Sequence, residues 1–292
     1  MKLIHIAAVS ALALTAACAT SEPMMDDAMM APAGPVTLGG FAGPESVSYD
    51  AVRDRYLVTN VGAFGEGNDG YISVVNPDGS TAERQWIAAS DDQELANPLG
   101  SAIFGGSLYV ADGPNVRLFD LETGAQTSVL TVEGSSGFND LAIAEDGTVY
   151  ATQTGTEDAS TWAIYRITSE GSASVFAEGE ALGRPNGIEM DGDGNIVTVG
   201  LGSTTLTVFN PGGDIVDTIE LPVAGNDGLI VMDDGYIVSS VFTGAIVWAG
   251  KDGATEMLAE GVQSAASITL DPTRNRVVIP QLLVQSLTLL DL

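Results

Sequence analysis

Four polar residues occupy equivalent positions of an internal repeat, and each carries side-chain oxygen. They lie within Pro44-Glu-Ser-Val47, Phe138-Asn-Asp-Leu141, Pro185-Asn-Gly-Ile188 and Asn226-Asp-Gly-Leu229. The shared position, two residues before the first apolar one, therefore holds Glu45, Asn139, Asn186 and Asp227, with Leu99 and Ala266 in the two other repeats. Carboxylate and amide oxygens suit a hard cation such as Ca²⁺. A cation would also remove the repulsion between two close carboxylates, about 4 kcal/mol at about 4 Å and an intermediate dielectric.

A second interpretation of these positions stays open. Asn-Gly and Asp-Gly are common turn dipeptides, so Asn186 and Asp227 are also explained as residues of two turns. That interpretation explains less well why Glu45 and Asn139 share the same position of the repeat.

The scarcity of histidine restricts the chemistry that this chain can perform. The single histidine is His5, and the single cysteine is Cys18. If the segment before Cys18 is removed, the remaining chain cannot run Ser-His-Asp or Cys-His catalysis, nor offer imidazole to zinc. Any metal is then expected to be bound by oxygen, which favours Ca²⁺ or Mg²⁺.

The repeat that places these residues is built from short strands. Strand-like segments start at intervals of 40 to 52 residues: Tyr56–Asn60, Leu108–Asp112, Val149–Gln153, Ile196–Gly200, Tyr236–Ser240 and Val277–Gln281. One apolar run precedes each segment and alternating runs follow it, separated by glycine-containing turns. Four strands in 40 to 50 residues are typical of a β-propeller blade, so the sequence predicts an all-β, six-bladed propeller.

Ring closure supports this prediction. The sixth repeat has only three strands before Leu292, and Pro35–Leu38 offers the missing outer strand, which would bury both strand edges. The first strand of each blade lines the central channel of a propeller, so the four oxygen-bearing residues are expected to ring one mouth. The loops after the second strands would wall that mouth, with Phe64 and Phe242 as apolar contacts.

The N-terminus has the pattern of a sorting signal. Residues 1–17 combine a basic start with a short apolar run, and Leu14–Cys18 resembles a bacterial lipobox, from which Thr15 departs. We expect removal of residues 1–17, lipidation of Cys18, a flexible tether over 18–35 and a propeller over 36–292. An ordinary secretory signal is the alternative. The predicted location is the bacterial cell envelope, facing the periplasm, with the outer membrane favoured by Ala19.

The charge excludes several partners. The chain has 39 acidic and 10 basic residues among 292, for a net charge of −29. Nucleic-acid binding needs a basic surface, and anionic lipid repels an acidic one, so we expect no nucleic acid and membrane contact only through the lipid anchor. We expect a monomer that meets a small-molecule substrate.

These motifs, in this order, resemble the SMP-30/gluconolactonase/LRE-like family of six-bladed propellers. The resemblance runs from about Gly40 to Leu292. It implies a cation, usually Ca²⁺ but also Mn²⁺, Zn²⁺ or Mg²⁺, held by Glu45, Asn186 and Asp227. It also implies that Asn139 faces the substrate or completes the metal shell, and that the activity is a lactonase or related ester hydrolase.

The implied mechanism gives each of these residues a role. The metal would polarise a lactone carbonyl, and Asp227 would orient or deprotonate the attacking water. Asn139 would position the substrate, while Asp140 either supports it from behind or caps the turn. Two departures from the family put a sugar lactone in doubt: Gly137 stands where an arginine is frequent, and Ser267 stands where some relatives are acidic. Arg184 is a candidate to replace that arginine or a plain surface charge.

Two functional hypotheses follow. The first is a lipid-anchored, metal-dependent hydrolase of a lactone or ester. The alternative is a non-catalytic propeller with a structural calcium that binds a small ligand or a protein partner, because fold alone does not fix activity.

Overall fold

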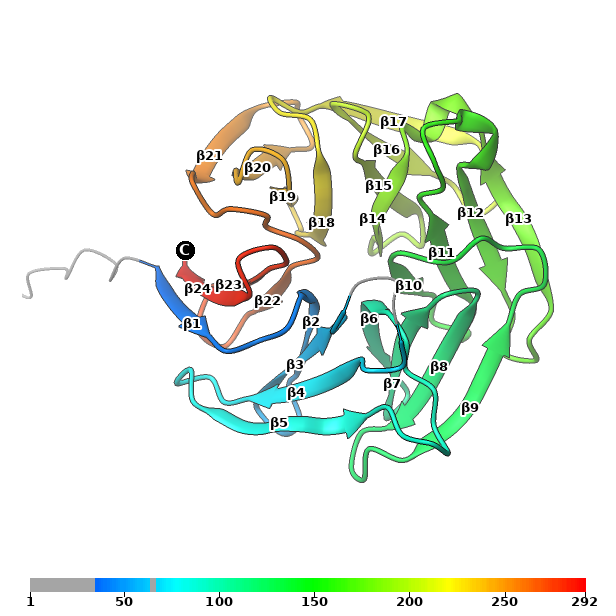
Figure 1. The fold of residues 1–292 in the computed structure, drawn as a ribbon. Coiled ribbons are helices and arrows are strands. Elements are labelled where there is room, and N and C mark those ends of the chain that lie inside the picture. The colour runs from blue at the N-terminus through cyan, green and yellow to red at the C-terminus, as the bar shows by residue number, and fades with distance from the viewer. Residues whose placement is uncertain (1–34, 64–66) are drawn as a thin grey trace, which may run out of the picture. The chain divides into compact units, whose positions relative to one another are not determined.

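Six four-stranded antiparallel sheets surround a central axis in the computed structural model, which describes residues 35–63 and 67–292 (Figure 1). This confirms the all-β, six-bladed propeller. The predicted signal segment, Cys18 and all but the last residue of the predicted tether lie outside the described residues, as does Phe64.

Each blade runs from an inner strand at the axis to an outer strand at the rim. The first three blades comprise β2 (Pro44–Asp50), β3 (Arg55–Asn60), β4 (Tyr71–Val75) and β5 (Thr81–Ala88); β6 (Pro98–Phe104), β7 (Ser107–Asp112), β8 (Asn115–Asp120) and β9 (Gln126–Thr131); and β10 (Leu141–Ile143), β11 (Val149–Gln153), β12 (Ala163–Ile167) and β13 (Ala173–Glu178).

The fourth and fifth blades follow the same order, and the sixth takes its outer strand from the other end of the chain. These blades comprise β14 (Pro185–Met190), β15 (Ile196–Gly200), β16 (Thr205–Phe209) and β17 (Ile215–Glu220); β18 (Asn226–Val231), β19 (Gly235–Ser240), β20 (Ile246–Gly250) and β21 (Thr255–Ala259); and β22 (Thr269–Asp271), β23 (Arg276–Gln281), β24 (Ser286–Asp291) and β1 (Val36–Gly39). All six recurring sequence segments lie in second strands. The only helices among the described residues are two 3₁₀ turns, Ala159–Thr161 and Glu180–Leu182, and no helix there is long and apolar enough to span a membrane.

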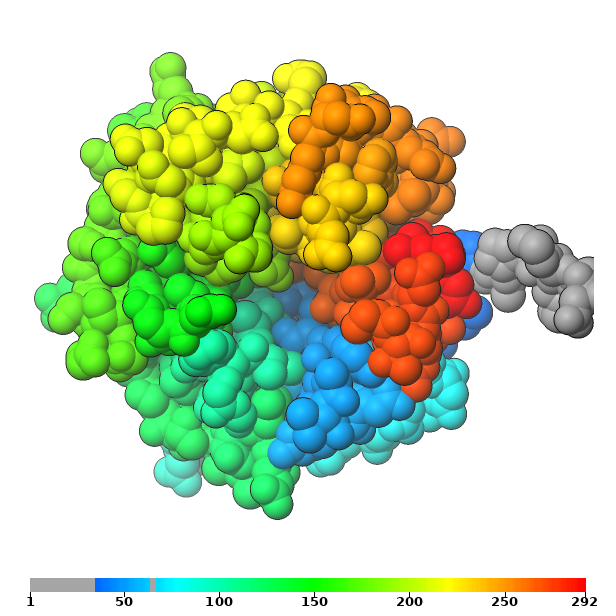
Figure 2. All heavy atoms as spheres, turned by 180° about the vertical axis from the view of Figure 1, so that it is seen from behind, coloured from blue at the N-terminus to red at the C-terminus, as the bar shows by residue number. Residues whose placement is uncertain are grey.

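The ring closes through the two ends of the propeller domain. β1 pairs antiparallel with β24 in the register Val36–Leu289 to Gly39–Ser286. From the opposite side, the blue N-terminal strands lie beside the red C-terminal ones (Figure 2). The strand predicted at residues 35–38 therefore completes the sixth blade.

The core is divided among the gaps between neighbouring blades. In the gap between the first two blades, Leu57 and Ile72 pack with Leu108 and Phe119, all fully buried. Five further apolar clusters fill the other gaps in the same way. The middle strands are mostly buried on both faces and are rich in apolar residues, while the outer strands are largely exposed.

A buried hydrogen bond ties the first blade to the last. The Tyr56 hydroxyl donates to Asp271 Oδ2 over 2.6 Å, and both residues are fully buried. We expect Tyr56→Phe to lower the free energy of unfolding by about 1–3 kcal/mol, because it leaves a charged acceptor without that donor. Urea denaturation checks this. Tyr49→Phe is the control, since its hydroxyl makes a surface hydrogen bond with Asp54; equal losses in both variants would contradict the prediction.

Candidate functional site

The candidate ring residues stand at the start of four inner strands. Glu45, Asn186 and Asp227 are the second residues of β2, β14 and β18, and Asn139 lies two residues before β10. Glu45, Asn186 and Asp227 are at most 5% exposed, and Asn139 is half-buried. Equivalent strand starts in successive blades bring these side chains, far apart in sequence, to one end of the channel.

A β-bulge presents three of these side chains in the same way. In β2, Pro44 pairs with Asn60 and the next pair is Val47 with Val58, so two residues oppose one. The same irregularity follows Pro185 in β14 and Asn226 in β18. Bulges re-aim a side chain locally, and here the first bulge residue is Glu45, Asn186 or Asp227.

The glycine after two of the ring residues lets neighbouring inner strands approach closely. A Cβ on Gly187 would lie 2.1 Å from the Asp227 carbonyl oxygen, and one on Gly228 would lie 2.6 Å from the Ala266 carbonyl oxygen. Asn186-Gly187 and Asp227-Gly228 are thus parts of bulged inner strands. Their interpretation as turn dipeptides is wrong, because the glycines serve strand-to-strand packing between blades.

The ring concentrates oxygen atoms that lack hydrogen-bond partners. Asn186 Nδ2 donates to Asp227 Oδ2 over 3.4 Å. In the described part of the chain, six buried side-chain nitrogen or oxygen atoms have no partner, and four belong to this ring: Glu45 Oε2, Asn139 Oδ1, Asn186 Oδ1 and Asp227 Oδ1. Buried polar atoms are normally paired, so such a group of open acceptors indicates a missing positive partner.

Burial and mutual repulsion oppose ionisation of the two ring carboxyls. Burial raises the pKa of Glu45 well above its ordinary value, and the charges of Asp227 and Asp140 raise it further. Burial also raises the pKa of Asp227, with a further rise from Asp140. A cation in the ring would reverse both shifts, since it favours the charged form.

The donor set fits a hard cation better than a transition metal. Nowhere in residues 35–63 and 67–292 do three or more His, Cys, Asp or Glu side chains gather as a metal-binding group. The ring instead offers two carboxylates and two amides, each of which can ligate a metal through oxygen. That combination, with the open oxygens above, suits Ca²⁺, whose shell accepts carboxylates, amide carbonyls and water.

Asp140 lies beyond the ring, inside the channel. Its Oδ1 accepts a hydrogen bond from the Leu141 backbone N–H over 2.9 Å, and its Oδ2 accepts one from Ser267 Oγ over 3.3 Å. No hydrogen bond between its carboxylate and Asn139 is found among the described residues. The structure thus links Asp140 across the channel to the sixth blade.

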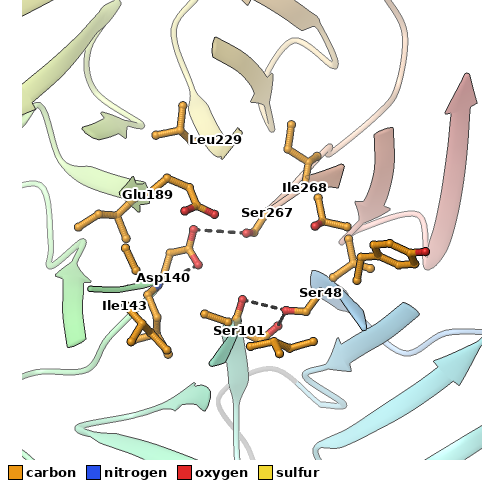
Figure 3. A pocket seen from close by; sticks show the side chains of 16 residues that line it. Ser48, Ser101, Asp140, Ile143, Glu189, Leu229, Ser267 and Ile268 are labelled. Atoms are coloured by element: carbon orange, nitrogen blue, oxygen red, sulfur yellow. Dashed lines mark hydrogen bonds between the residues drawn. The ribbon is translucent and has the colours of Figure 1, made fainter. Parts of the chain in front are cut away.

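The channel holds a polar cavity that sequence reasoning missed. It measures about 230 Å³ and is lined by Ser48, Ser101, Asp140, Glu189 and Ser267, among others. Asp140, Glu189 and Ser267 point toward one another there (Figure 3). The Glu189 side chain is accessible to solvent within the channel, although the inner strands surround it on the protein side. Burial raises the pKa of Asp140 to about 7, while burial and the Asp140 charge raise that of Glu189 to about 8.

One sequence feature could have indicated that Glu189 belongs to the site: it lies three residues after Asn186 in the same strand. Charge in an otherwise apolar inner strand is unusual. Which residue it faces, however, depends on how the third and fourth blades meet.

In the described part of the chain, the loops after the second strands begin at the same edge as the ring, as predicted. There Arg184, with φ of 63°, pairs with Glu157 of the neighbouring blade. Gly137 has φ of 127°, a conformation that residues with a side chain rarely adopt. An arginine at this position would therefore strain the backbone. Phe242 lies in the described part of this wall and is exposed.

Comparisons with known proteins bear on this geometry. Residues 68–188 match the SMP-30/Gluconolactonase/LRE-like region, which confirms the resemblance over this stretch. It contains Asn139, Asp140 and Asn186, while Glu45 and Asp227 lie outside it. A comparison with curated proteins finds no match.

Solved structures of the same architecture are similar over most of their length. A gluconolactonase from Xanthomonas campestris is 19% identical, with a TM-score of 0.67 over 88% of this chain and 89% of that one. Virginiamycin B lyase from Staphylococcus aureus is 15% identical, with a TM-score of 0.64 over 88% of this chain and 99% of that one. A catalytically inactive histidine-to-alanine variant of that lyase, with quinupristin, is 14% identical, with a TM-score of 0.60 over 88% and 99% of the two chains. At these identities the likeness establishes the fold.

Proposed function

We propose, from the premise that this chain carries an SMP-30/gluconolactonase/LRE-like region within a six-bladed propeller, that it is a divalent-cation-dependent hydrolase of a lactone or related ester. The observation that carries the proposal is the ring of four buried oxygens without partners on Glu45, Asn139, Asn186 and Asp227. A ring of open acceptors at a channel mouth suits a cation that a substrate carbonyl can also reach.

The ring residues have different roles in the proposed hydrolysis. Glu45, Asn186 and Asp227 would hold the ion, with Ca²⁺ preferred and Mn²⁺, Zn²⁺ or Mg²⁺ as alternatives. When bound, the ion supplies polarisation of the carbonyl and charge stabilisation for the developing oxyanion. Asp227 accepts the proton of the attacking water, because no histidine lies in the propeller to do so. The water oxygen bonds to the acyl carbon, and the bond between that carbon and the lactone-ring oxygen breaks. Asp227 returns the proton to the leaving oxygen, so a hydroxy acid results.

Asn139 and Asp140 have different roles in the proposed reaction. Asn139 is less buried than the other three members, which supports the assignment of its side-chain amide as a hydrogen-bond donor to the substrate. Asp140 acts from inside the channel: its carboxylate is held by Ser267, and its charge raises the pKa of Glu45 and Asp227. We therefore assign it a supporting role.

The lyase-like alternative is disfavoured by the residue inventory. The S. aureus lyase loses catalysis in a histidine-to-alanine variant, whereas the single histidine of this chain, His5, precedes the propeller. Lactone hydrolysis through oxygen ligands requires no imidazole. The lipid anchor at Cys18, the periplasm-facing location and the monomeric state remain predictions from the sequence.

Metal removal tests the proposal. Purified protein should hydrolyse members of a panel of lactones and aryl esters, lose that activity in EDTA, and regain it with Ca²⁺, Mn²⁺, Mg²⁺ or Zn²⁺. Turnover that EDTA leaves unchanged would contradict a metal-dependent mechanism. If no substrate reacts and Ca²⁺ still raises the melting temperature, the chain is a binding propeller with a structural ion.

A further inference from the structure

The exposed large apolar side chains in the described part of the chain fall into two groups by their distance from the ring. Most lie on outer strands or at the opposite edge, away from the ring. Three lie at the ring edge, in the loops that follow the second strands of the fifth and sixth blades: Phe242 (67% exposed), Leu283 (78%) and Val284 (43%). We call these three residues the apolar rim.

Phe242 lies directly against the chain segment that leads to Asp227. A Cβ on Gly225 would be 2.4 Å from Phe242 Cδ2, so the aromatic ring occupies the space beside that glycine. The neighbouring Val241 N–H donates to the Gly225 carbonyl over 2.9 Å. The backbone thus holds Phe242 beside the ring while most of its surface stays open to solvent.

The loop of Leu283 is fixed by hydrogen bonds to Ser264, and it approaches the segment before Glu45. The Leu283 N–H donates to Ser264 Oγ over 3.0 Å, and the Leu282 N–H donates to the Ser264 carbonyl over 3.1 Å. Leu282 Cδ1 lies 3.7 Å from the position of a Cβ on Gly43, two residues before Glu45. The Phe242 loop is therefore hydrogen-bonded to the segment that carries Asp227, and the Leu282 side chain contacts the segment that carries Glu45.

We infer that the apolar rim binds an alkyl or aryl substituent of the substrate, so that the preferred substrate class is an apolar lactone or ester. The assignment of this ligand as a substrate rests on the proposed function. A molecule whose carbonyl reaches the ring extends its substituent over Phe242 and Leu283. The chain's net charge of −29 disfavours an anionic substituent, and Arg184 at this edge is already paired with Glu157.

A series of γ-alkyl lactones from methyl to octyl tests this inference. Burial of each methylene against the rim should raise kcat/KM by up to about fourfold. Phe242→Ser and Leu283→Ser should flatten this dependence and lower kcat/KM for the octyl lactone about tenfold or more, mainly through KM, while the methyl lactone changes little. Val52→Ser is the matched control, because Val52 is 89% exposed in the hairpin at the opposite edge. Leu283→Ser also covers the case in which loss of the Phe242 packing prevents folding.

Calorimetric titration with the same lactones keeps the inference separate from the proposed function. Turnover without chain-length dependence, or with dependence that both rim variants retain, overturns the inference and leaves the hydrolase intact. Chain-length-dependent binding that is lost in the rim variants, without turnover, supports the rim and overturns the hydrolase. Neither turnover nor binding of any member overturns both.

Discussion

Asp227→Asn will abolish hydrolysis while leaving the propeller folded. The change removes a charged ligand and the proton acceptor but keeps the size of the side chain, so we expect kcat to fall by at least about a hundredfold. The buried carboxyl gains nothing from ionisation in the metal-free protein, where its pKa is raised by burial and by Asp140. Metal-free Asp227→Asn should therefore melt no lower than the metal-free parent.

The measurements are initial rates on the best substrate of the panel and melting curves with and without Ca²⁺. Asp217→Asn is the matched control, since Asp217 lies exposed on the outer strand β17. The parent and the control should gain stability from Ca²⁺, about 2.7 kcal/mol at a concentration a hundredfold above Kd, and Asp227→Asn should gain much less. A variant that retains full activity would remove Asp227 from the mechanism.

The metal-free protein will lose stability as pH rises, and Ca²⁺ will restore it. Glu45, Asp227, Asp140 and Glu189 all have pKa values raised in the folded state. The folded state therefore binds protons more tightly than the unfolded chain between the ordinary and the raised pKa values, and stability falls with pH across that range.

The window follows from the individual groups. The loss should begin near the ordinary carboxyl pKa of about 4 and extend to the pKa of about 7 for Asp140 and about 8 for Glu189. Asp140 alone corresponds to a loss on the order of 4 kcal/mol across this window. Urea denaturation of EDTA-treated protein measures this loss of stability. The measurements should run from about pH 4 to about pH 9, which bracket the titration of these groups.

Glu45→Gln and Glu189→Gln separate the ring from the channel. Each variant removes one carboxyl whose pKa is raised in the folded state, so each should raise the stability of the metal-free protein at alkaline pH and reduce its pH dependence. Only Glu45→Gln should also lose stabilisation by Ca²⁺, because Glu189 belongs to the channel cavity. Stability of the metal-free parent that rises with pH, or full Ca²⁺ stabilisation of Glu45→Gln, would contradict the assignment.

The ring positions were predictable because blades repeat. Glu45, Asn186 and Asp227 fall on one position of the repeat, and that position has one place in every blade. What the repeat did not reveal is the bulge that aims them. A bulge is defined by two residues opposite one on a neighbouring strand, and local sequence contains only one side of that pairing. Asn-Gly and Asp-Gly consequently looked like turns.

The channel interior was not predictable for a similar reason. Asp140 and Ser267 are 127 residues apart, and their hydrogen bond depends on how the third and sixth blades face each other across the axis. Glu189 belongs to a third inner strand, and its pKa is raised by burial among the inner strands and by the charge of Asp140. The pairing of Arg184 with Glu157 likewise joins two loops whose proximity no motif records.

The sequence by itself determined the class of fold, the number of blades and the closing strand, because alternation along a strand and the spacing of turns are local properties that repeat six times. It also named the oxygen-bearing residues at one mouth. Only the tertiary structure decided which of their oxygens lack partners, which carboxyl faces the channel, and which apolar side chains stand beside the ring. Those properties depend on contacts between blades, and contacts between blades exist only once the ring has closed.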